Sequence, residues 1–254
     1  MEPNSSALFK NRKLSQFADF WYKVTSPVFG SRRIKTKLQE LRRSNPWPDI
    51  SVLDGRPSYE WSLDGGGRQL IVDLIRERRP KVFLEVGVFV GGSALQWLRN
   101  SPDNMTLIVA DIWDQSPEYW VEAMVRERPS WIEDIEPALA LQAVFKECGI
   151  YKVALHNLRD FRDRVIPLRI PATTLYGYLR GFLEPDIIYI DATKERQEYV
   201  LAHEIFPRSI LCGDDWEWRD DTGEFGVRPF VYEVAEARNC DVVVEGATWV
   251  LRPR

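Results

Sequence analysis

From residue 81 onward, short apolar runs alternate with helix-like segments, and this alternation restricts the fold more than any other feature of the sequence. The apolar runs predict strands at 81–86, 105–110, 151–155, 186–190 and 209–213. The intervening segments predict helices, among them 93–98, 173–182 and 227–238, with two more inside 114–150. Continuous apolar strands separated by helices are typical of a mostly parallel sheet with helices on both faces. Two last runs, 241–244 and 248–251, predict a closing antiparallel hairpin.

The composition fits one large globular domain with an added N-terminal arm. Of the 254 residues, 44% are apolar and 28% are charged, which is usual for a globular protein. The three cysteines are scattered, without the spacing of a disulfide framework or a zinc site, and this predicts a reducing compartment. No run predicts a transmembrane helix or a signal peptide, so we expect a cytoplasmic protein.

Residues 1–50 form the basic arm. They contain ten Lys and Arg but four acids, a net charge of +6 that leaves −10 for the rest of the chain. Apolar residues recur there at helical spacing: Phe17, Phe20, Trp21 and Val24. One interpretation is a helix docked on the body or on a second subunit of a homo-oligomer. The other is a basic amphipathic segment that contacts an anionic membrane surface or an acidic glycan carrier. Pro46 and Pro48 interrupt the segment, so we predict a helical arm at 1–50 and a main domain at 51–254.

The first predicted strand ends in a glycine-rich turn within FLEVGVFVGGSALQWL, residues 83–98. Glu85 ends the strand, Gly87 and Gly91 form the turn, and Ser93 stands where a helix would be capped. A dinucleotide-binding fingerprint needs glycine at its third position, where this sequence has phenylalanine. A phosphate-binding P-loop needs a Gly-Lys-Ser/Thr ending, which is absent. The turn therefore fits neither of these two phosphate-binding motifs.

The spacing Glu-x-Gly-x-x-x-Gly-Gly-Ser resembles the first motif of class I S-adenosylmethionine-dependent methyltransferases. In that family the glycine turn lets the backbone approach the amino-acid end of the cofactor. The second strand, in LIVADIW, ends in an acid suited to a bidentate grip on the ribose hydroxyls. The cofactor-binding candidates are Glu85, Gly87, Gly91, Ser93, Asp111 and Trp113. The resemblance implies an α/β fold with a doubly wound, mostly parallel, seven-stranded Rossmann-like methyltransferase sheet and a C-terminal antiparallel hairpin.

Three carboxylates end the fourth and fifth predicted strands. Asp191 follows the strand in DIIYIDATKERQEYV, and Asp214 and Asp215 follow the strand in SILCGDDW. These strands are neighbours in the methyltransferase sheet, so the acids are expected together at one edge of the cofactor pocket. Clustered like charges need a counter-charge, and Mg²⁺, a hard cation with oxygen ligands, is the natural candidate. Lys194 lies three positions after Asp191, and a nearby Mg²⁺ disfavours its ammonium form, which predicts a general base.

Two groups of methyltransferases share parts of this pattern. The Asp-Ala-Thr-Lys element at 191–194 resembles the Asp-x-x-Lys element of cation-dependent O-methyltransferases of the catechol and caffeoyl-CoA type. This resemblance implies that Asp191 binds the metal and that Lys194 is catalytic. GDDW at 213–216, with FGVRPFVYEV and TWVLR after it, resembles the macrocin O-methyltransferase and cephalosporin-hydroxylase-like group, which acts on sugars and antibiotic scaffolds. The resemblances together span roughly residues 60–252.

They imply a Mg²⁺-dependent O-methyltransferase that uses S-adenosylmethionine. The expected acceptor is one hydroxyl of a vicinal diol on a sugar, glycan or natural-product scaffold, and no nucleic-acid partner is expected. A catechol-type phenolic acceptor is the first alternative, and a hydroxylase-like reaction or a non-catalytic binding module on the same fold are the others. Residues 114–150 are predicted to cover the substrate. Trp113, just before this segment, and Trp120 and Trp131 within it suit stacking on a sugar face or an aromatic ring, although core packing explains them equally well. His156, at the end of the third predicted strand, is a candidate contact to adenine or substrate.

Overall fold

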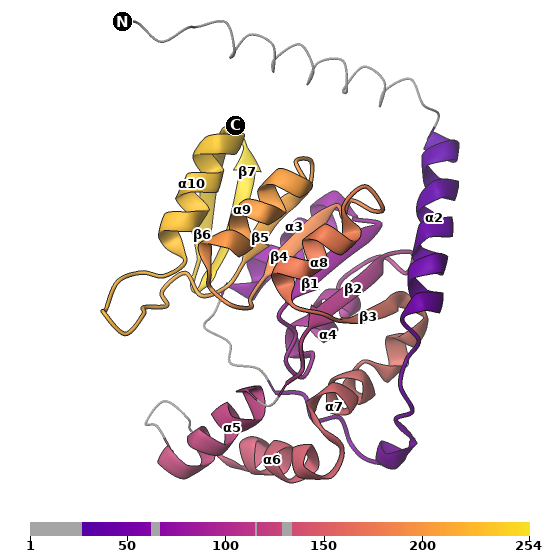
Figure 1. Cartoon of the computed structure of the whole chain (residues 1–254), viewed down its shortest axis with the longest axis vertical. Helices are drawn as coiled ribbons and strands as arrows, with labels where there is room; N and C mark the ends of the chain where they lie inside the picture. The colour runs from indigo at the N-terminus through magenta and orange to yellow at the C-terminus, as the bar shows by residue number, and fades with distance from the viewer. Residues whose placement is uncertain (1–26, 62–66, 115, 129–133) are drawn as a thin grey trace, which may run out of the picture. The chain divides into compact units, whose positions relative to one another are not determined.

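The computed structural model describes residues 27–61, 67–114, 116–128 and 134–254, and the chain divides into two units, residues 1–44 and 45–254 (Figure 1). In the first unit the described residues form helix α2 (Pro27–Ser44), which carries six basic residues and one acid, Glu40. The apolar set predicted for the arm lies outside the described residues: Phe17, Phe20, Trp21 and Val24. The domain boundary at residue 50 stays a prediction. Within the described part of the chain, no helix has both the length and the apolar content needed to cross a bilayer.

The described residues of the second unit surround a seven-stranded sheet in the order β3-β2-β1-β4-β5-β7-β6 (Figure 1). The strands are β1 (Val82–Val86), β2 (Thr106–Asp111), β3 (Val165–Arg169), β4 (Ile187–Ile190), β5 (Ile210–Gly213), β6 (Cys240–Glu245) and β7 (Thr248–Pro253). The first five are parallel, and β7 is antiparallel to both of its neighbours, β5 and β6. This arrangement confirms the predicted fold class and the closing hairpin.

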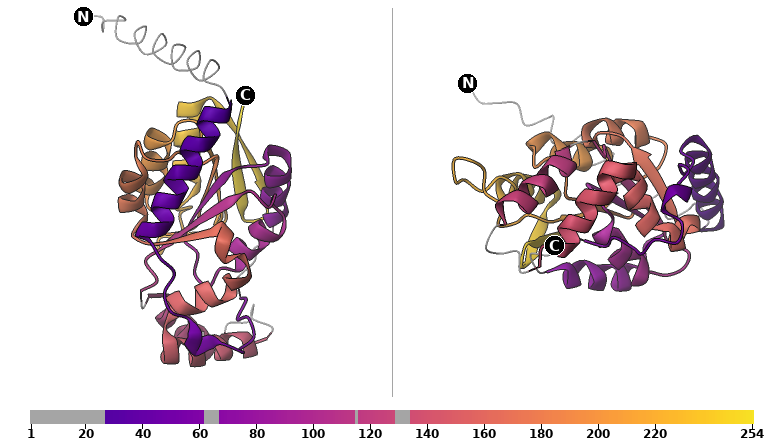
Figure 2. Two further views of the ribbon diagram at one scale, coloured as in Figure 1. Left: turned by 90° about the vertical axis from the view of Figure 1, so that its right-hand side faces the viewer. Right: turned by 90° about the horizontal axis from the view of Figure 1, so that it is seen from below.

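Helices cover both faces of this sheet. The described helices of the second unit are η1 (Ser51–Leu53), α3 (Arg68–Arg78), α4 (Gly92–Arg99), α5 (Ser116–Glu127), α6 (Glu136–Cys148), α7 (Ile150–Asn157), η2 (Arg159–Arg164), α8 (Ala172–Leu179), α9 (Arg196–Ile205) and α10 (Arg228–Arg238). Figures 1 and 2 show α8, α9 and α10 side by side on one face, with α3 and α4 on the other. Beyond the end of β2, the chain continues into α5 and α6, which pack against each other away from the sheet.

Aromatic packing holds the two central strands together. Strands β1 and β4 are buried along their whole length, because helices lie on both sides. Phe83 of β1 stacks on Trp97 of α4, and Trp97 meets Tyr189 of β4 edge-on. A buried aromatic side chain removes roughly 150–250 Å² from water, which stabilises the fold by about 4–6 kcal/mol before entropy costs. Val86 pairs with Ile190, so the residues that follow β1 and β4 emerge side by side.

The third strand was predicted in the wrong place. Residues 151–155 belong to helix α7, and the third strand is β3 at 165–169. The short apolar run of α7 is buried, and so short a run does not distinguish a helix from a strand by its pattern. Strand β3 contains Pro167, which weakens a strand prediction, but β3 lies at the edge of the sheet, where a missing N–H is tolerated.

Candidate active site

A cavity of about 790 Å³ lies at the carboxyl ends of β1, β2, β4 and β5. This volume is in the range of small-molecule and cofactor sites, and its position is the one where open α/β sheets bind ligands. The predicted site residues that line it are Gly87, Ser93, Asp111, Asp191, Lys194, Asp214 and Asp215. The structure thus brings together side chains that are more than one hundred residues apart in sequence.

The turn after β1 requires glycine for two reasons. Gly87 has φ of 85°, and a Cβ there would lie 1.8 Å from the carbonyl oxygen of Asp191, so the turn touches the end of β4 directly. Gly91 has φ of 84°, and a Cβ there would lie 3.3 Å from Leu158 Cγ. Phe89, between them, also has a positive φ, of 51°. A non-glycine residue in this conformation is uncommon and often marks a functional site.

Glu85 lies beneath this turn and is fully buried. The hydroxyl of Ser93, on the first turn of α4, donates a hydrogen bond to Glu85 Oε1. Burial raises the pKa of the Glu85 carboxyl to about 8, although the hydrogen bond from Ser93 and the charge of Arg68 act in the opposite direction. Neither Glu85 nor Gly91 is among the residues that line the cavity. They support the turn from below, while Gly87 and Ser93 reach the cavity wall.

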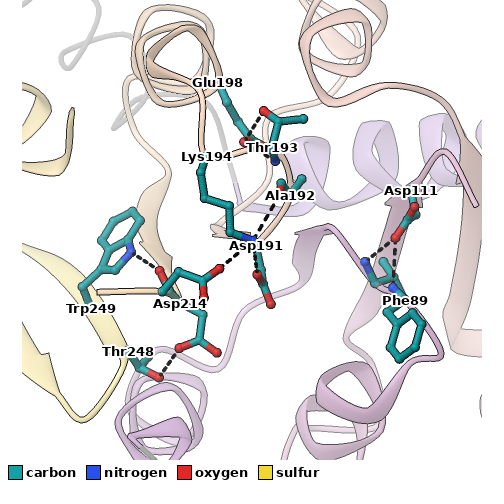
Figure 3. A network of polar contacts seen from close by, with 12 residues as sticks. Phe89, Asp111, Asp191, Ala192, Thr193, Lys194, Glu198, Asp214, Thr248 and Trp249 are labelled. Atoms are coloured by element: carbon teal, nitrogen blue, oxygen red, sulfur yellow. Dashed lines mark hydrogen bonds and ion pairs between the residues drawn. The ribbon is translucent and has the colours of Figure 1, made fainter. Parts of the chain in front are cut away.

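Asp111 binds the glycine turn as well as facing the cavity (Figure 3). Its Oδ2 accepts hydrogen bonds from the backbone N–H groups of Val88 (2.7 Å) and Phe89 (2.9 Å). Its Oδ1 accepts one from the N–H of Trp113 at 2.9 Å. A carboxylate offers about four acceptor positions, so about one is left for a ligand. If Asp111 accepted hydrogen bonds from two ribose hydroxyls, at least one of its carboxylate oxygens would therefore have to accept from a hydroxyl and from the backbone at the same time.

Two aromatic candidates are part of the core. The ring of Trp113 is buried against Tyr151, its Nε1 donates to the carbonyl oxygen of Phe89 at 2.8 Å, and it does not line the cavity. The prediction for His156 was wrong because α7 was taken for a strand. His156 is buried in that helix, with Nε2 3.0 Å from the carbonyl oxygen of Pro57.

The acids that follow β4 and β5 surround a lysine. Lys194 Nζ lies 2.6 Å from Asp215 Oδ2 and 3.4 Å from Asp191 Oδ1 (Figure 3). Lys194 and Asp215 both have left-handed backbone conformations, with φ of 60° and 63°. Asp214 is held from the other side, because Thr248 Oγ1 donates to its Oδ1 at 3.3 Å and Trp249 Nε1 donates to its carbonyl oxygen at 3.1 Å. The strained backbone and the ion pairs direct one ammonium between two carboxylates.

The charges of this cluster control one another. Burial raises the pKa of Asp191, against the opposing charge of Lys194, and burial together with the charge of Asp215 raises that of Asp214. Burial acts to lower the pKa of Lys194, but the charges of Asp191 and Asp215 outweigh it and raise that pKa above its ordinary value. The neighbouring carboxylates therefore stabilise the protonated form of Lys194. A bound cation is expected to do the opposite and to lower the pKa of Lys194.

The cluster offers hard oxygen ligands of the kind that Mg²⁺ binds. Asp191, Asp214 and Asp215 all line the same cavity, and the first and last of them contact the same nitrogen. Within the described ranges, however, no three acidic, histidine or cysteine side chains are already arranged as a metal-binding group. The residue chemistry fits a divalent cation, and the ammonium of Lys194 stands between two of the candidate ligands, Asp191 and Asp215.

Sequence patterns missed an aromatic wall and a buried arginine. Trp61 stacks on Trp120 with ring centroids 5.9 Å apart, and Phe89 meets Trp120 edge-on at 5.8 Å. Trp218, from the loop after β5, also lines the cavity, and a Cβ on Gly226 would lie 2.1 Å from its ring. The cavity is further lined by Arg68. Of the three tryptophans predicted to stack on the substrate, only Trp120 lines the cavity; Trp113 is buried away from it, and Trp131 lies outside the described residues.

Comparison with known proteins agrees with this architecture. No protein-family model matches the sequence. Catechol O-methyltransferase of Mus musculus is 31% identical over 111 residues, which are 39% of this chain and 41% of that enzyme. The chain thus matches less than half the length of this curated relative.

Solved structures extend the likeness to the whole fold. A cofactor-bound structure of Rv0187 from MTB aligns with a TM-score of 0.52 and 16% identity, covering 100% of this chain and 99% of that one. An O-methyltransferase from Bacillus cereus in complex with SAH aligns with a TM-score of 0.50 and 14% identity, covering 86% of this chain and 91% of that one. The chain has the class I, Rossmann-like methyltransferase fold. None of these three singles out the macrocin and cephalosporin-hydroxylase-like group.

Proposed function

We propose that the protein is an S-adenosylmethionine-dependent O-methyltransferase. The observation that carries this proposal is the convergence of a glycine turn, the strand-end acid Asp111 and the cluster around Lys194 on one cavity. The named relatives support it, since they include O-methyltransferases.

The cofactor would lie across the ends of β2, β1 and β4. Asp111 would accept a ribose hydroxyl with its remaining acceptor position, and Gly87 would let the backbone approach the amino-acid end. Ser93 lines this end of the cavity and is oriented by its hydrogen bond to buried Glu85. Gly91 and Trp113 would contribute to cofactor binding indirectly, by holding the glycine turn in place. Gly91 lets the turn pack close to Leu158, and Trp113 donates a hydrogen bond to the carbonyl oxygen of Phe89.

The acidic cluster fits a divalent cation, and Mg²⁺ is the one we propose. Asp191, Asp214 and Asp215 would hold it with carboxylate oxygens. When bound, the cation would supply positive charge that lowers the pKa of an acceptor hydroxyl beside it. No Cys or His belongs to the cluster, so zinc is not the expected metal.

Lys194 would remove the proton of the attacking hydroxyl. Its Nζ lies at the cavity between Asp191 and Asp215, so it needs no large movement to reach an acceptor bound there. Paired with two carboxylates it holds its proton, because they raise its pKa. It can therefore act as a base only when the charge of these carboxylates is neutralised by another group. The deprotonated oxygen would then attack the sulfonium methyl in line, with positioning supplying much of the rate.

The acceptor we propose is a vicinal diol on a sugar, glycan or natural-product scaffold. The exposed rings of Trp120 and Trp218 lie at the cavity and suit stacking on the apolar face of a sugar. Helix α5, which carries Trp120, would cover the acceptor, as proposed for residues 114–150. A catechol is the second candidate, because the curated relative is a catechol O-methyltransferase and aromatic rings stack equally well on tryptophan.

The remaining partner assignments are also proposals. Residues 1–50 would form a basic arm that contacts either a second copy of the chain or an anionic surface. The six basic residues of α2 against one acid support an anionic contact.

The test is methyl transfer from labelled S-adenosylmethionine to a panel of glycosides and catechols with adjacent hydroxyls. Transfer should stop with EDTA and return with Mg²⁺ or Mn²⁺. Asp191→Asn and Asp214→Asn should remove the response to the cation. Asp241→Asn is the matched control, because that exposed acid pairs with Arg254 at the opposite edge of the sheet, and it should leave transfer unchanged. Transfer that is insensitive to EDTA would refute the cation, and absence of cofactor binding would refute the proposed function.

A further inference from the structure

Glu198 is a buried carboxylate that contacts the turn between β4 and α9 rather than the cavity. It lies in the first turn of α9, is fully buried, and is not among the residues that line the cavity. Its Oε2 accepts two hydrogen bonds from Thr193, one from the backbone N–H at 3.1 Å and one from the hydroxyl at 3.2 Å (Figure 3). A carboxylate is almost never fully buried unless such bonds replace its lost hydration.

The reach of Glu198 differs from that of an ordinary helix cap. A glutamate at the third position of a helix commonly accepts from the backbone N–H of the N-cap residue. In α9 the N-cap residue is Glu195, and the carboxylate of Glu198 reaches two residues further back, to Thr193. The contact therefore ties the helix to the residue that immediately precedes Lys194, and does more than close the end of the helix.

The turn that Glu198 holds gives Lys194 its unusual backbone conformation. Lys194 has φ of 60°, which is uncommon for a residue other than glycine and persists only where neighbouring contacts enforce it. Its Nζ donates to the carbonyl oxygen of Ala192 at 3.2 Å, so the side chain folds back over the same turn to reach its two carboxylate partners. A shift of the backbone at Thr193 would therefore move the ammonium.

Asp191 and Lys194 are held by different neighbours. The backbone N–H of Asp191 donates to the carbonyl oxygen of the last residue of β1 at 2.8 Å, and the close approach of Gly87 fixes the same residue against the end of that strand. Lys194 follows Thr193 and depends instead on the contact of that residue with α9. Loss of the Glu198 carboxylate should therefore displace the lysine and leave Asp191 in place.

We propose that Glu198 is a positioning residue: its two hydrogen bonds to Thr193 place the ammonium of Lys194 between its carboxylate partners. The inference rests on the proposed function, since the base that Glu198 positions is the one proposed for methyl transfer. It adds a residue that neither lines the cavity nor ends a strand. The competing role is purely structural, in which Glu198 closes the start of α9 and stabilises the fold without acting on Lys194.

The first test is methyl transfer by variants of Glu198. Glu198→Leu should lower kcat by about 10- to 100-fold, the scale for two lost hydrogen bonds. It should change the affinity for S-adenosylhomocysteine less than about threefold and should not weaken Mg²⁺ binding, because Asp191 stays in place. Glu198→Gln should restore most of the turnover, since one amide oxygen can accept both bonds at the position of Oε2. Glu204→Leu, an exposed position of the same helix, is the control and should leave turnover unchanged.

A double-mutant cycle separates the two roles. In a Lys194→Met background, Glu198→Leu should lower kcat by less than about twofold, because the lysine that it positions is already absent. The same 10- to 100-fold loss in both backgrounds, or a Glu198→Gln variant as slow as Glu198→Leu, would assign Glu198 a structural role and overturn the inference.

Reductive methylation of lysine amines with formaldehyde and cyanoborohydride gives a readout that needs no turnover. An amine held in ion pairs reacts slowly, because only its free, deprotonated form attacks the aldehyde. By peptide mass spectrometry, Lys194 should react at least about threefold faster in Glu198→Leu than in wild type, while exposed Lys81 keeps its rate. Thr193→Val, which removes only the hydroxyl donor, should give a smaller increase and replaces Glu198→Leu if that variant does not fold.

An unchanged rate of Lys194 methylation in these variants would overturn the inference. If wild type transfers no methyl group to any acceptor while Lys194 still reacts faster in Glu198→Leu, the proposed function fails and the placement of the ammonium by Glu198 stands.

Discussion

Replacing Glu85 with glutamine should make the stability of the protein less dependent on pH. Glu85 is fully buried, and its pKa of about 8 in the folded protein compares with an ordinary value of 4.5. Between these values the folded chain keeps a proton that the unfolded chain releases. A rise in pH therefore favours the unfolded state by about 1.4 kcal/mol per pH unit. From pH 5.5 to 7.5 this one carboxyl should lower the free energy of unfolding by about 2–3 kcal/mol.

The assay is denaturant unfolding followed by tryptophan fluorescence, at pH 5.5 and 7.5 and constant ionic strength. Between pH 5.5 and 7.5, the free energy of unfolding of Glu85→Gln should fall by about 2–3 kcal/mol less than that of wild type. Burial also raises the pKa of Glu198, to about 7, but that group is unchanged in both proteins and cancels in the comparison. Glu236→Gln, on the exposed side of α10, is the control and should keep the wild-type dependence. If wild type and Glu85→Gln lose stability in parallel, Glu85 is ionised in the folded protein and the reasoning fails.

Three further predictions concern the cavity. Lys194→Met should reduce turnover by roughly 10²–10⁴-fold while tightening Mg²⁺ binding measured by calorimetry, because it removes a competing positive charge; normal turnover would exclude the base role. Asp111→Ala should weaken cofactor binding by about 1.5–3 kcal/mol and also lower the melting temperature, because three backbone N–H groups lose their acceptor; an unchanged affinity would remove Asp111 from the ribose site. Gly226→Ala should displace the ring of Trp218 and raise the KM for the acceptor as Trp218→Ala does, with cofactor affinity unchanged; an effect on the cofactor alone would place Trp218 elsewhere.

The parts of the fold that could be predicted were those with a strong local signal. Strands β1, β2, β4 and β5 are buried on both faces and therefore appear as continuous apolar runs. Strand β3 was missed because Pro167 is tolerated only at a sheet edge, and edge position is a property of the whole sheet rather than of the local sequence.

The same distinction applies to the site. Asp111, Asp191 and Asp214 could be predicted to converge, because parallel strands present their carboxyl ends at one edge. Arg68 and Trp218 could not, since they reach the cavity from loop and helix starts whose placement depends on contacts such as that between Gly67 and the β6–β7 turn. The charge state of Lys194 could not be predicted either, because it depends on the distances from its ammonium to two carboxylates, Asp191 and Asp215, which are known only from the folded structure.

The insertion of β7 between β5 and β6 has a consequence for biosynthesis. Strand β7 follows all the other described strands in the sequence, yet Thr248 and Trp249 supply the hydrogen bonds that hold Asp214. A nascent chain on the ribosome cannot complete the acidic cluster until residue 249 has emerged from the exit tunnel. Until then β5 presents an open edge, which is a template for pairing with other chains. A chain truncated before residue 248 should therefore be inactive and prone to aggregation, even though strands β1 to β5 are complete.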